Sequence, residues 1–291
     1  MLFTSYPSYK RGLYERRTYK KVTMFFSISL VAEEVFRVGN FPVTNSLFTM
    51  WVGILLFSLM VIGGTRKLTL VPRGFQIVLE GLYSFFLNLC ESVLGEKKLA
   101  ERAMPFIITI FLFVFVGNIF EVIPGVGSIG FFKETSPETS EFVARAASGP
   151  GEEPHSKKFI PLFRPGSADL NTTVALALIS VITVQAVGIK TLGMGYLKRF
   201  FNFTNPINFF VGILELISEF AKIISFSFRL FGNIFAGEVL LAVMLMLVPY
   251  FVPIPFYGLE LFVAIVQAFV FAMLTLVFIK LAMIPHGGES H

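Results

Sequence analysis

The sequence predicts an all-α polytopic membrane protein, with about five membrane-embedded helices, one interfacial amphipathic helix and a long, strongly tilted C-terminal helical hairpin. Of the 291 residues, 55% are hydrophobic and 36 are Phe, and the mean hydropathy is +0.75, values typical of membrane chains. Several apolar stretches reach the roughly 20 residues that a helix needs to cross a bilayer. From Pro206 the chain is apolar nearly to its end.

Composition also limits the chemistry. The only cysteine, Cys90, excludes a disulfide framework and a cysteine-based metal site, and all three histidines lie in polar stretches. No phosphate-binding glycine loop, metalloprotease motif or hydrolase motif is present. We therefore expect no cofactor, no metal and no catalytic site of its own. The net charge of +5 indicates anchoring and orientation at a lipid surface, not nucleic-acid binding.

We expect a polar, basic N-terminal segment over residues 1–43, lying outside the membrane or removed. Residues 1–23 lack the apolar core of a secretory signal. Two alternatives stay open: an Arg-bearing mitochondrial presequence, or an over-long gene prediction whose true start is Met24.

Residues 44–285 form a single predicted membrane domain. The first span runs from Ser46 to Ile62, with Trp51 as an interfacial anchor. Residues 72–100 are only half apolar, with apolar side chains at helical spacing, which predicts an amphipathic helix in the interface and not a span. The second span covers Met104 to Ile123.

Residues 124–168 form the one long hydrophilic region. We interpret 132–165 as an extramembranous, partly disordered loop that serves as padding. Asp169 then opens a third span over 170–189, as an N-cap residue does.

The basic loops 63–102 and 190–199 are expected on the cytoplasmic or matrix side, and two spans between them are consistent with that placement. This topology puts the N-terminus outside, where its basic residues are unfavourable. The conflict favours a removed or misannotated N-terminus.

The hairpin covers residues 206–284. We expect helices over 206–248 and 257–284, joined by a segment with prolines at 249, 253 and 255 that no continuous helix tolerates. Both helices exceed the length of a perpendicular span, so strong tilt is expected. Residues 286–291 are a solvated tail.

Arg229 is the most informative residue, because it lies within an apolar run from Ile223 to Val248. Placing an arginine at that depth in a bilayer costs roughly a few kcal/mol on insertion scales. An arginine that is kept there at such a cost predicts a functional site. The alternative is that Arg229 marks a helix end and snorkels to the interface. The apolar sequence on both sides argues against this alternative.

Further polar residues lie on the same two helices. Glu215, Lys222 and Arg229 are spaced by seven and share a helical face, and so do Glu260 and Gln267. Glu238 lies nine residues from Arg229 and points nearly the opposite way. For Glu215, Glu219 and Lys222, an interfacial set of ion pairs is an equally good interpretation.

Carboxylates in membrane helices can relay protons, because desolvation raises their pKa toward the working range. Arginine does not deprotonate in proteins, so it acts as a fixed positive charge. Acids on both sides of one arginine therefore predict two half-paths that must not short-circuit. A mobile proton carrier has to come from a partner.

The segment Phe228-Arg229-Leu-Phe-Gly-Asn233 with Ala236-Gly-Glu238, followed by Gln267-Ala-Phe, resembles subunit a of F-type ATP synthase. Further matches are Asn118-Ile-Phe-Glu121-Val-Ile-Pro124, Ala168-Asp169-Leu-Asn171 and Leu214-Glu215. The resemblance covers about 44–131 and 166–285. It implies a membrane subunit of the ATP synthase complex with two partners, the rotating c-ring and the peripheral-stalk subunit b.

By that resemblance, Arg229 is the stator arginine facing the ring carboxylates, accompanied by Gln267. The residues implied for the entry half-channel are Asn118, Glu121, Asn233, Glu238 and Glu260. Glu215 is implied for the exit half-channel. The resemblance also implies a bacterial inner membrane, or alternatively a mitochondrial one.

One departure from the family concerns Glu238 and Glu260, where members commonly pair a glutamate with a histidine. Without a histidine to titrate near neutrality, we hypothesise that the two carboxylates share a proton.

Two rival functions remain from the residues alone. A proton-coupled secondary transporter would need a substrate site and commonly has internal repeats, and the sequence shows no repeat. A purely structural assembly subunit would tolerate the loss of Arg229.

Overall fold

The computed structural model describes residues 34–39, 41–66, 69, 71–123, 129–134, 157–197, 200, 206–248 and 251–284. Three predicted segments fall wholly or largely outside these ranges: the basic residues 1–23, the tail 286–291 and most of the loop 132–165.

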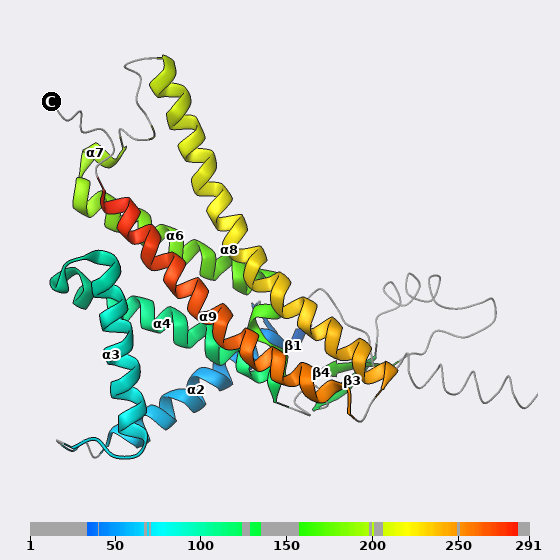
Figure 1. Cartoon of the computed structure of the whole chain (residues 1–291). Helices are drawn as coiled ribbons and strands as arrows, with labels where there is room; N and C mark the ends of the chain where they lie inside the picture. The colour runs from blue at the N-terminus through cyan, green and yellow to red at the C-terminus, as the bar shows by residue number, and fades with distance from the viewer. Residues whose placement is uncertain are drawn as a thin grey trace, which may run out of the picture.

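Helices dominate the described chain, in the arrangement of Figure 1. They are α2 (Asn45–Thr65), α3 (Phe75–Leu94), α4 (Lys97–Val122), the 3₁₀ turn η2 (Gly166–Ala168), α6 (Leu170–Leu192), the short α7 (Met194–Leu197), α8 (Pro206–Leu247) and α9 (Pro253–Met283). Six of them, α2, α3, α4, α6, α8 and α9, are long and apolar enough to cross a membrane. The all-α polytopic membrane fold is therefore confirmed.

The helix α2 runs past Ile62, where we expected the first span to end. It begins at Asn45, where the Thr44 side chain accepts a hydrogen bond from the Leu47 N–H, and it continues to Thr65. Gly64 lies inside this helix, and a β-carbon at Gly64 would overlap the Phe75 ring at the start of α3. Glycine here permits close approach of two helices and does not end the first one.

The predicted amphipathic helix 72–100 is two elements. α3 ends at Leu94, and Gly95 (φ 79°) takes the left-handed conformation that stops a helix. α4 then begins at Lys97, seven residues before the predicted start of the second span at Met104. Apolarity alone placed that start too late, because the first turns of α4 are charged and still helical.

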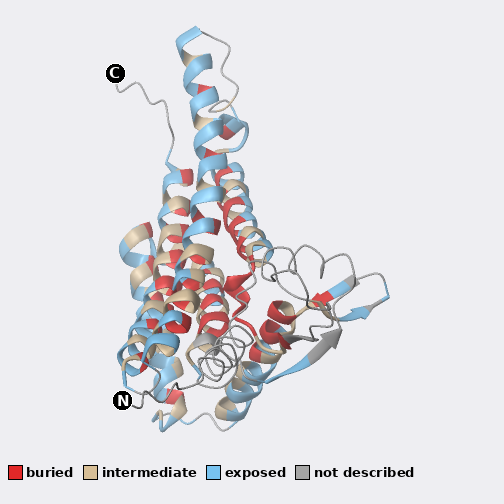
Figure 2. Cartoon of the chain, turned by 90° about the vertical axis from the view of Figure 1, so that its right-hand side faces the viewer, coloured by how far each residue is buried: buried red, intermediate tan, exposed pale blue. Residues whose placement is uncertain are grey.

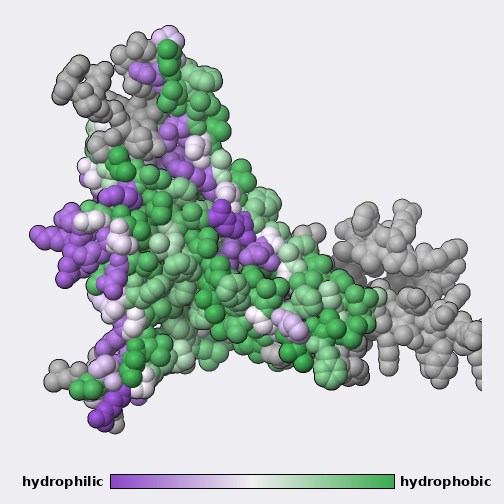
Figure 3. All heavy atoms as spheres, in the orientation of Figure 1, coloured by the Kyte–Doolittle hydropathy of each residue, from purple (hydrophilic) through white to green (hydrophobic). Residues whose placement is uncertain are grey.

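The orientation of α3 differs from that of its neighbours. Figure 1 shows it at a steep angle to α4, α6 and α9, linking the end of α2 to the start of α4. Hydrophilic side chains gather at the α3–α4 corner in Figure 3. The Lys280 Nζ of α9 donates to the Leu94 carbonyl there at 2.7 Å, which ties the last turns of α9 to this corner. An interfacial position for α3 remains our prediction.

α9 begins at Pro253, four residues before the predicted 257. Proline suits this place because the first N–H groups of a helix have no intrahelical acceptor, so the missing donor costs nothing. The proline-rich joint is therefore partly the first turn of α9.

Two short antiparallel hairpins were not predicted. β1 (Glu34–Val38) pairs with β2 (Phe41–Thr44), and β3 (Gly130–Glu134) pairs with β4 (Lys157–Pro161). Both strands of the second pair, β3 and β4, come from the hydrophilic region 124–168. The beginning of that region is therefore paired with a segment near its end. Strands this short carry little periodic signal, and so the sequence did not reveal them.

The core lies where α3, α4, α6, α8 and α9 meet, and Figure 2 shows the buried residues along these contacts. Its largest fully buried side chains include Phe86, Ile107, Leu230 and Phe271. Two hydroxyl pairs add polar ties: Thr173 to Ser227 of α8 at 3.2 Å, and Ser180 to Thr275 of α9 at 2.8 Å. α6 is thus hydrogen-bonded to both helices of the hairpin.

Candidate functional site

Arg229 lies on the exposed side of α8, midway along an apolar helix. Its neighbours Ile224 and Phe228 are also exposed, at 59% and 56%. Within the described part of the chain, the Arg229 guanidinium has no hydrogen-bond or ion-pair partner. A full positive charge is therefore presented outward on a surface that is otherwise suited to lipid or to another apolar protein.

Asn233 and Gln267 connect the two hairpin helices one turn from Arg229. The Asn233 Nδ2 donates to the Gln267 Oε1 at 3.2 Å, and Gln267 is 94% buried while Asn233 is exposed. The Gln267 Nε2 has no acceptor among the described residues. The structure thus joins Gln267 to Asn233, and a role for Gln267 beside Arg229 stays a prediction.

Glu260 is buried between α9 and α8 with only 4% of its surface exposed. Its carboxyl group lies directly against the backbone of Gly237, where a β-carbon would overlap both carboxyl oxygens. No hydrogen bond or ion pair joins Glu260 to another residue of the described ranges. The lack of a side chain at Gly237 therefore leaves room for the Glu260 carboxyl group inside the bundle.

Glu238, the next residue, is held quite differently. Its Oε2 accepts a hydrogen bond from the Arg164 Nη2 at 3.3 Å, forming an ion pair in which the side chains are 28% and 5% exposed. Glu238 follows Gly237 in the chain and is paired with Arg164, whereas Glu260 lies against Gly237 and has no charged partner among the described residues.

Arg164 is a site residue that sequence reasoning missed, and it corrects the interpretation of residues 132–165 as padding. The end of that segment is packed into the bundle, not outside it. The signal available was an arginine just before the Pro165 to Asp169 turn that opens α6, but nothing in the sequence indicates its partner on α8, 74 positions away.

Asn118 and Glu121 lie on the last turns of α4. The Asn118 side chain is fully buried, and neither its Nδ2 nor its Oδ1 has a partner among the described residues. An amide buried in this way is costly unless water or another group satisfies it. For Glu121 the structure places the backbone only.

Glu215 lies far from this cluster, toward the start of α8. Nearby, the Lys222 Nζ donates to the Glu219 Oε1 at 2.6 Å and stands 4.8 Å from the centre of the Phe278 ring. The i,i+3 ion pair confirms one of the two interpretations given above for Glu219 and Lys222. It also separates the region of Glu215 from that of Arg229.

Hydrophilic residues form a diagonal row along α8 on the otherwise hydrophobic face seen in Figure 3. The described residues contain no group of three or more His, Cys, Asp or Glu side chains that could hold a metal ion.

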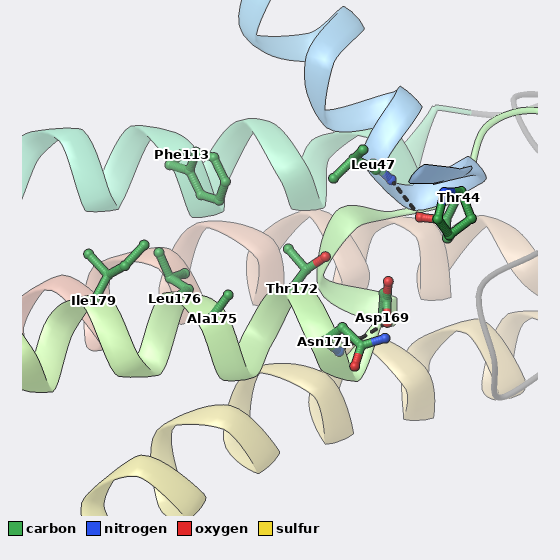
Figure 4. A pocket seen from close by; sticks show the side chains of 10 residues that line it. Thr44, Leu47, Phe113, Asp169, Asn171, Thr172, Ala175, Leu176 and Ile179 are labelled. Carbon is green, nitrogen blue, oxygen red and sulfur yellow. Dashed lines mark hydrogen bonds between the residues drawn. The ribbon is translucent and has the colours of Figure 1, made fainter. Parts of the chain in front are cut away.

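A separate hollow of about 420 Å³ opens between the start of α2, α4 and α6 (Figure 4). Two capping bonds lie at one end of it, from the Leu47 N–H to Thr44 and from the Asn171 N–H to Asp169. Its walls are otherwise mostly apolar, including Phe113, Leu176 and Ile179. These caps fix the starts of α2 and α6, which flank Arg164.

Comparisons with known proteins agree on one family. A family model described as ATP synthase A chain matches residues 47–280. The chain is 31% identical over 258 residues to the ATP synthase subunit a of Moorella thermoacetica, covering 87% of this chain and 96% of that relative. It is 32% identical over 263 residues to the ATP synthase subunit a of Helicobacter pylori strain Shi470, covering 88% of this chain and 98% of that relative.

Proposed function

Since the chain belongs to the ATP synthase A chain family and is a membrane-sector component of that complex, we propose that it is the proton-conducting stator of the motor. In this proposal, two half-channels deliver protons to and from the carboxylates of a rotating c-ring. Arg229 stands between the two half-channels and prevents a short circuit. The remaining partner is the peripheral-stalk subunit b, and the site of action is a bacterial inner membrane.

The observation that carries the proposal is the exposed Arg229 on an apolar helix face, which has no ion-pair partner among the described residues. A guanidinium keeps its proton, so it cannot relay protons itself. In a membrane its charge calls for a carboxylate, and the described part of this chain offers it none. A carboxylate on a neighbouring subunit satisfies both requirements, and it can give up its proton when it meets Arg229.

The two half-channels are assigned from the other polar groups. Asn118, Asn233, Glu238 and Glu260, together with Glu121, form the entry side, and Gln267 steadies Asn233. Glu215 belongs to the exit side, near the other end of α8. The Glu219–Lys222 pair lies between Glu215 and Arg229, where a fixed pair of charges keeps the two routes apart.

The test is ATP-driven proton pumping by inverted membrane vesicles that carry Arg229→Ala. We expect pumping to be abolished although the subunit is incorporated into the complex. Arg73→Ala, at an exposed position before α3, is the matched control and should pump normally. Retained pumping by the incorporated Arg229→Ala variant would refute the stator role and favour a structural subunit.

Co-purification in mild detergent tests the partners. The proposal expects a ring of small proteolipid subunits and a soluble ATPase to accompany the chain. A chain that purifies alone and transports a solute with protons would instead be a secondary transporter.

A further inference from the structure

We propose that Arg164 is a positioning residue of the entry half-channel, which holds Glu238 in an ion pair and leaves Glu260 as the carboxyl that carries the proton onward. The inference rests on the proposed function and adds to it a residue outside the hairpin. The observation behind it is the ion pair between the Arg164 Nη2 and the Glu238 Oε2 at 3.3 Å.

Arg164 is held in place by the first turns of α2. Its backbone N–H donates to the Thr49 Oγ1 at 2.9 Å, and the Thr49 hydroxyl donates in turn to the Asn45 carbonyl at 2.8 Å. Three residues earlier, the Pro161 carbonyl accepts a hydrogen bond from the Asn45 Nδ2 at 3.2 Å. Asn45 and Thr49 are at least 99% buried, so this anchor lies inside the protein.

The next turn of the segment is equally constrained. A β-carbon at Gly166 would overlap the Met50 side chain, so the backbone approaches α2 more closely than another residue would allow. The backbone around Arg164 is therefore held against α2, and its guanidinium extends from there to Glu238 on α8. A rigid cation of this kind fixes the rotamer of the carboxylate it pairs with.

The division of roles follows from the two environments. Glu238 is held in place by the charge of Arg164, and the arginine itself neither releases nor accepts a proton. Glu260 lies against Gly237 and has no ion pair within the described ranges, so no charged group of these ranges holds it. The two acids are thus unequal, and the proton moves through Glu260 while the Arg164–Glu238 pair shapes the path beside it.

The proposal is tested by a double-mutant cycle in the assembled complex, with ATP-driven proton pumping as the readout. We expect Arg164→Gln to slow pumping by about tenfold or more, since removal of the arginine leaves the partly buried Glu238 carboxylate without this ion pair. Arg164→Lys should recover a substantial part of the rate, because the charge returns without the planar fork. Arg164→Gln combined with Glu238→Gln should pump no more slowly than Glu238→Gln alone.

Two controls make the outcome decisive. Thr49→Val keeps the side-chain shape but removes the acceptor that holds the Arg164 backbone, and it should slow pumping in the same direction as Arg164→Gln. If Arg164→Gln does not assemble, the double variant should, because neither charge is then buried alone. Failure of both variants to assemble would overturn the pairing as the reason for Arg164.

Other results also overturn the inference. A wild-type rate in assembled Arg164→Gln would do so, and so would losses that simply multiply in the double variant. Arg229→Ala run alongside separates the two levels: abolished pumping there with an unaffected Arg164→Gln leaves the stator role standing and removes only this inference. Pumping retained by Arg229→Ala removes the stator role itself.

Discussion

The charged residues of the hairpin differ chiefly in what each one faces. Arg229 is exposed and has no partner in the described part of the chain, Glu238 is paired with Arg164, and Glu260 lies against Gly237. Residue type alone does not distinguish the two glutamates, and the sequence led us to treat them as equivalent members of a coupled pair. Their surroundings predict different consequences when each is changed.

Gly237→Ala tests the close contact between the Gly237 backbone and the Glu260 carboxyl group. The added methyl group would overlap the Glu260 carboxyl, and overpacking of a buried site typically costs about 1–3 kcal/mol. We expect proton pumping to fall by about fivefold or more, from the displaced carboxyl. Gly258→Ala is the matched control, because a β-carbon there meets nothing within 4 Å. Equal pumping by the two variants would show that the contact between Gly237 and Glu260 does not matter for proton transport.

Glu260→His and Glu260→Ala compare a titratable with a non-titratable replacement. If Glu260 carries protons, a histidine, which titrates near neutrality, should preserve more pumping than an alanine does. Proton pumping in vesicles with matched subunit content measures the difference. The same low rate in both variants would remove a proton-carrying role at this position.

At the scale of elements, α6 is the support that holds the hairpin. Its hydroxyls reach Ser227 on α8 and Thr275 on α9. Hydrogen bonds between membrane helices are worth about 0.6 kcal/mol on average and up to about 1.7. Several such ties, added to the packing of Phe226 against Phe271, keep the two long helices in register.

Ser180→Ala and Thr275→Val test this support. We expect each single variant to lower the stability of the subunit in the detergent-purified complex by about 0.5–1.5 kcal/mol. The double variant should lose little more than one single variant, since both remove the same bond. The measurement is the midpoint of thermal dissociation of the subunit.

Thr183→Val is the control for that series. The Thr183 hydroxyl bonds only within its own helix, to the Ile179 carbonyl, and its loss should leave the midpoint unchanged. Independent, additive losses at Ser180 and Thr275 would contradict a shared bond.

For the whole molecule, the topology is set by the side of the membrane on which each connection between helices lies. The basic loops predict that the α2–α3 connection and the α3–α4 corner share one side. The steep angle of α3 to the neighbouring helices in Figure 1 supports this topology, because α3 then returns to the side from which it started.

Engineered cysteines at Thr69, Lys97 and Phe131 test the topology with a membrane-impermeant maleimide. All three positions are exposed, and the native Cys90 is fully buried, so the unsubstituted chain serves as the unlabelled control. We expect the variants at 69 and 97 to react from the cytoplasmic side and the variant at 131 from the opposite side. Labelling of 69 and 97 from opposite sides would mean that α3 crosses the membrane.

The helices α2, α4, α6, α8 and α9 were predictable because each contains a long apolar stretch, and the bilayer requires such stretches to be helical. The helix α3 was predictable from the helical spacing of its apolar side chains. The ends of these helices were harder to place. The helix α4 begins earlier than predicted because its first turns are charged. The helix α2 continues past the predicted end, and its Gly64 lies close to Phe75. Of the site, Arg229 was evident from its cost in an apolar helix, whereas Arg164 depends on a contact across 74 positions that no local pattern reveals.

The sequence by itself thus determined the fold class, the hairpin and the residues of α8 and α9 that bear charge, because hydrophobicity and helical periodicity are local properties. Only the tertiary structure decided which charges meet. It separated Glu238 from Glu260 by giving the first an arginine and the second a close contact with Gly237, and it left Arg229 facing outward. Pairing depends on how helices distant in the chain are packed, and packing is set by side-chain shape over the whole bundle and not by any single stretch.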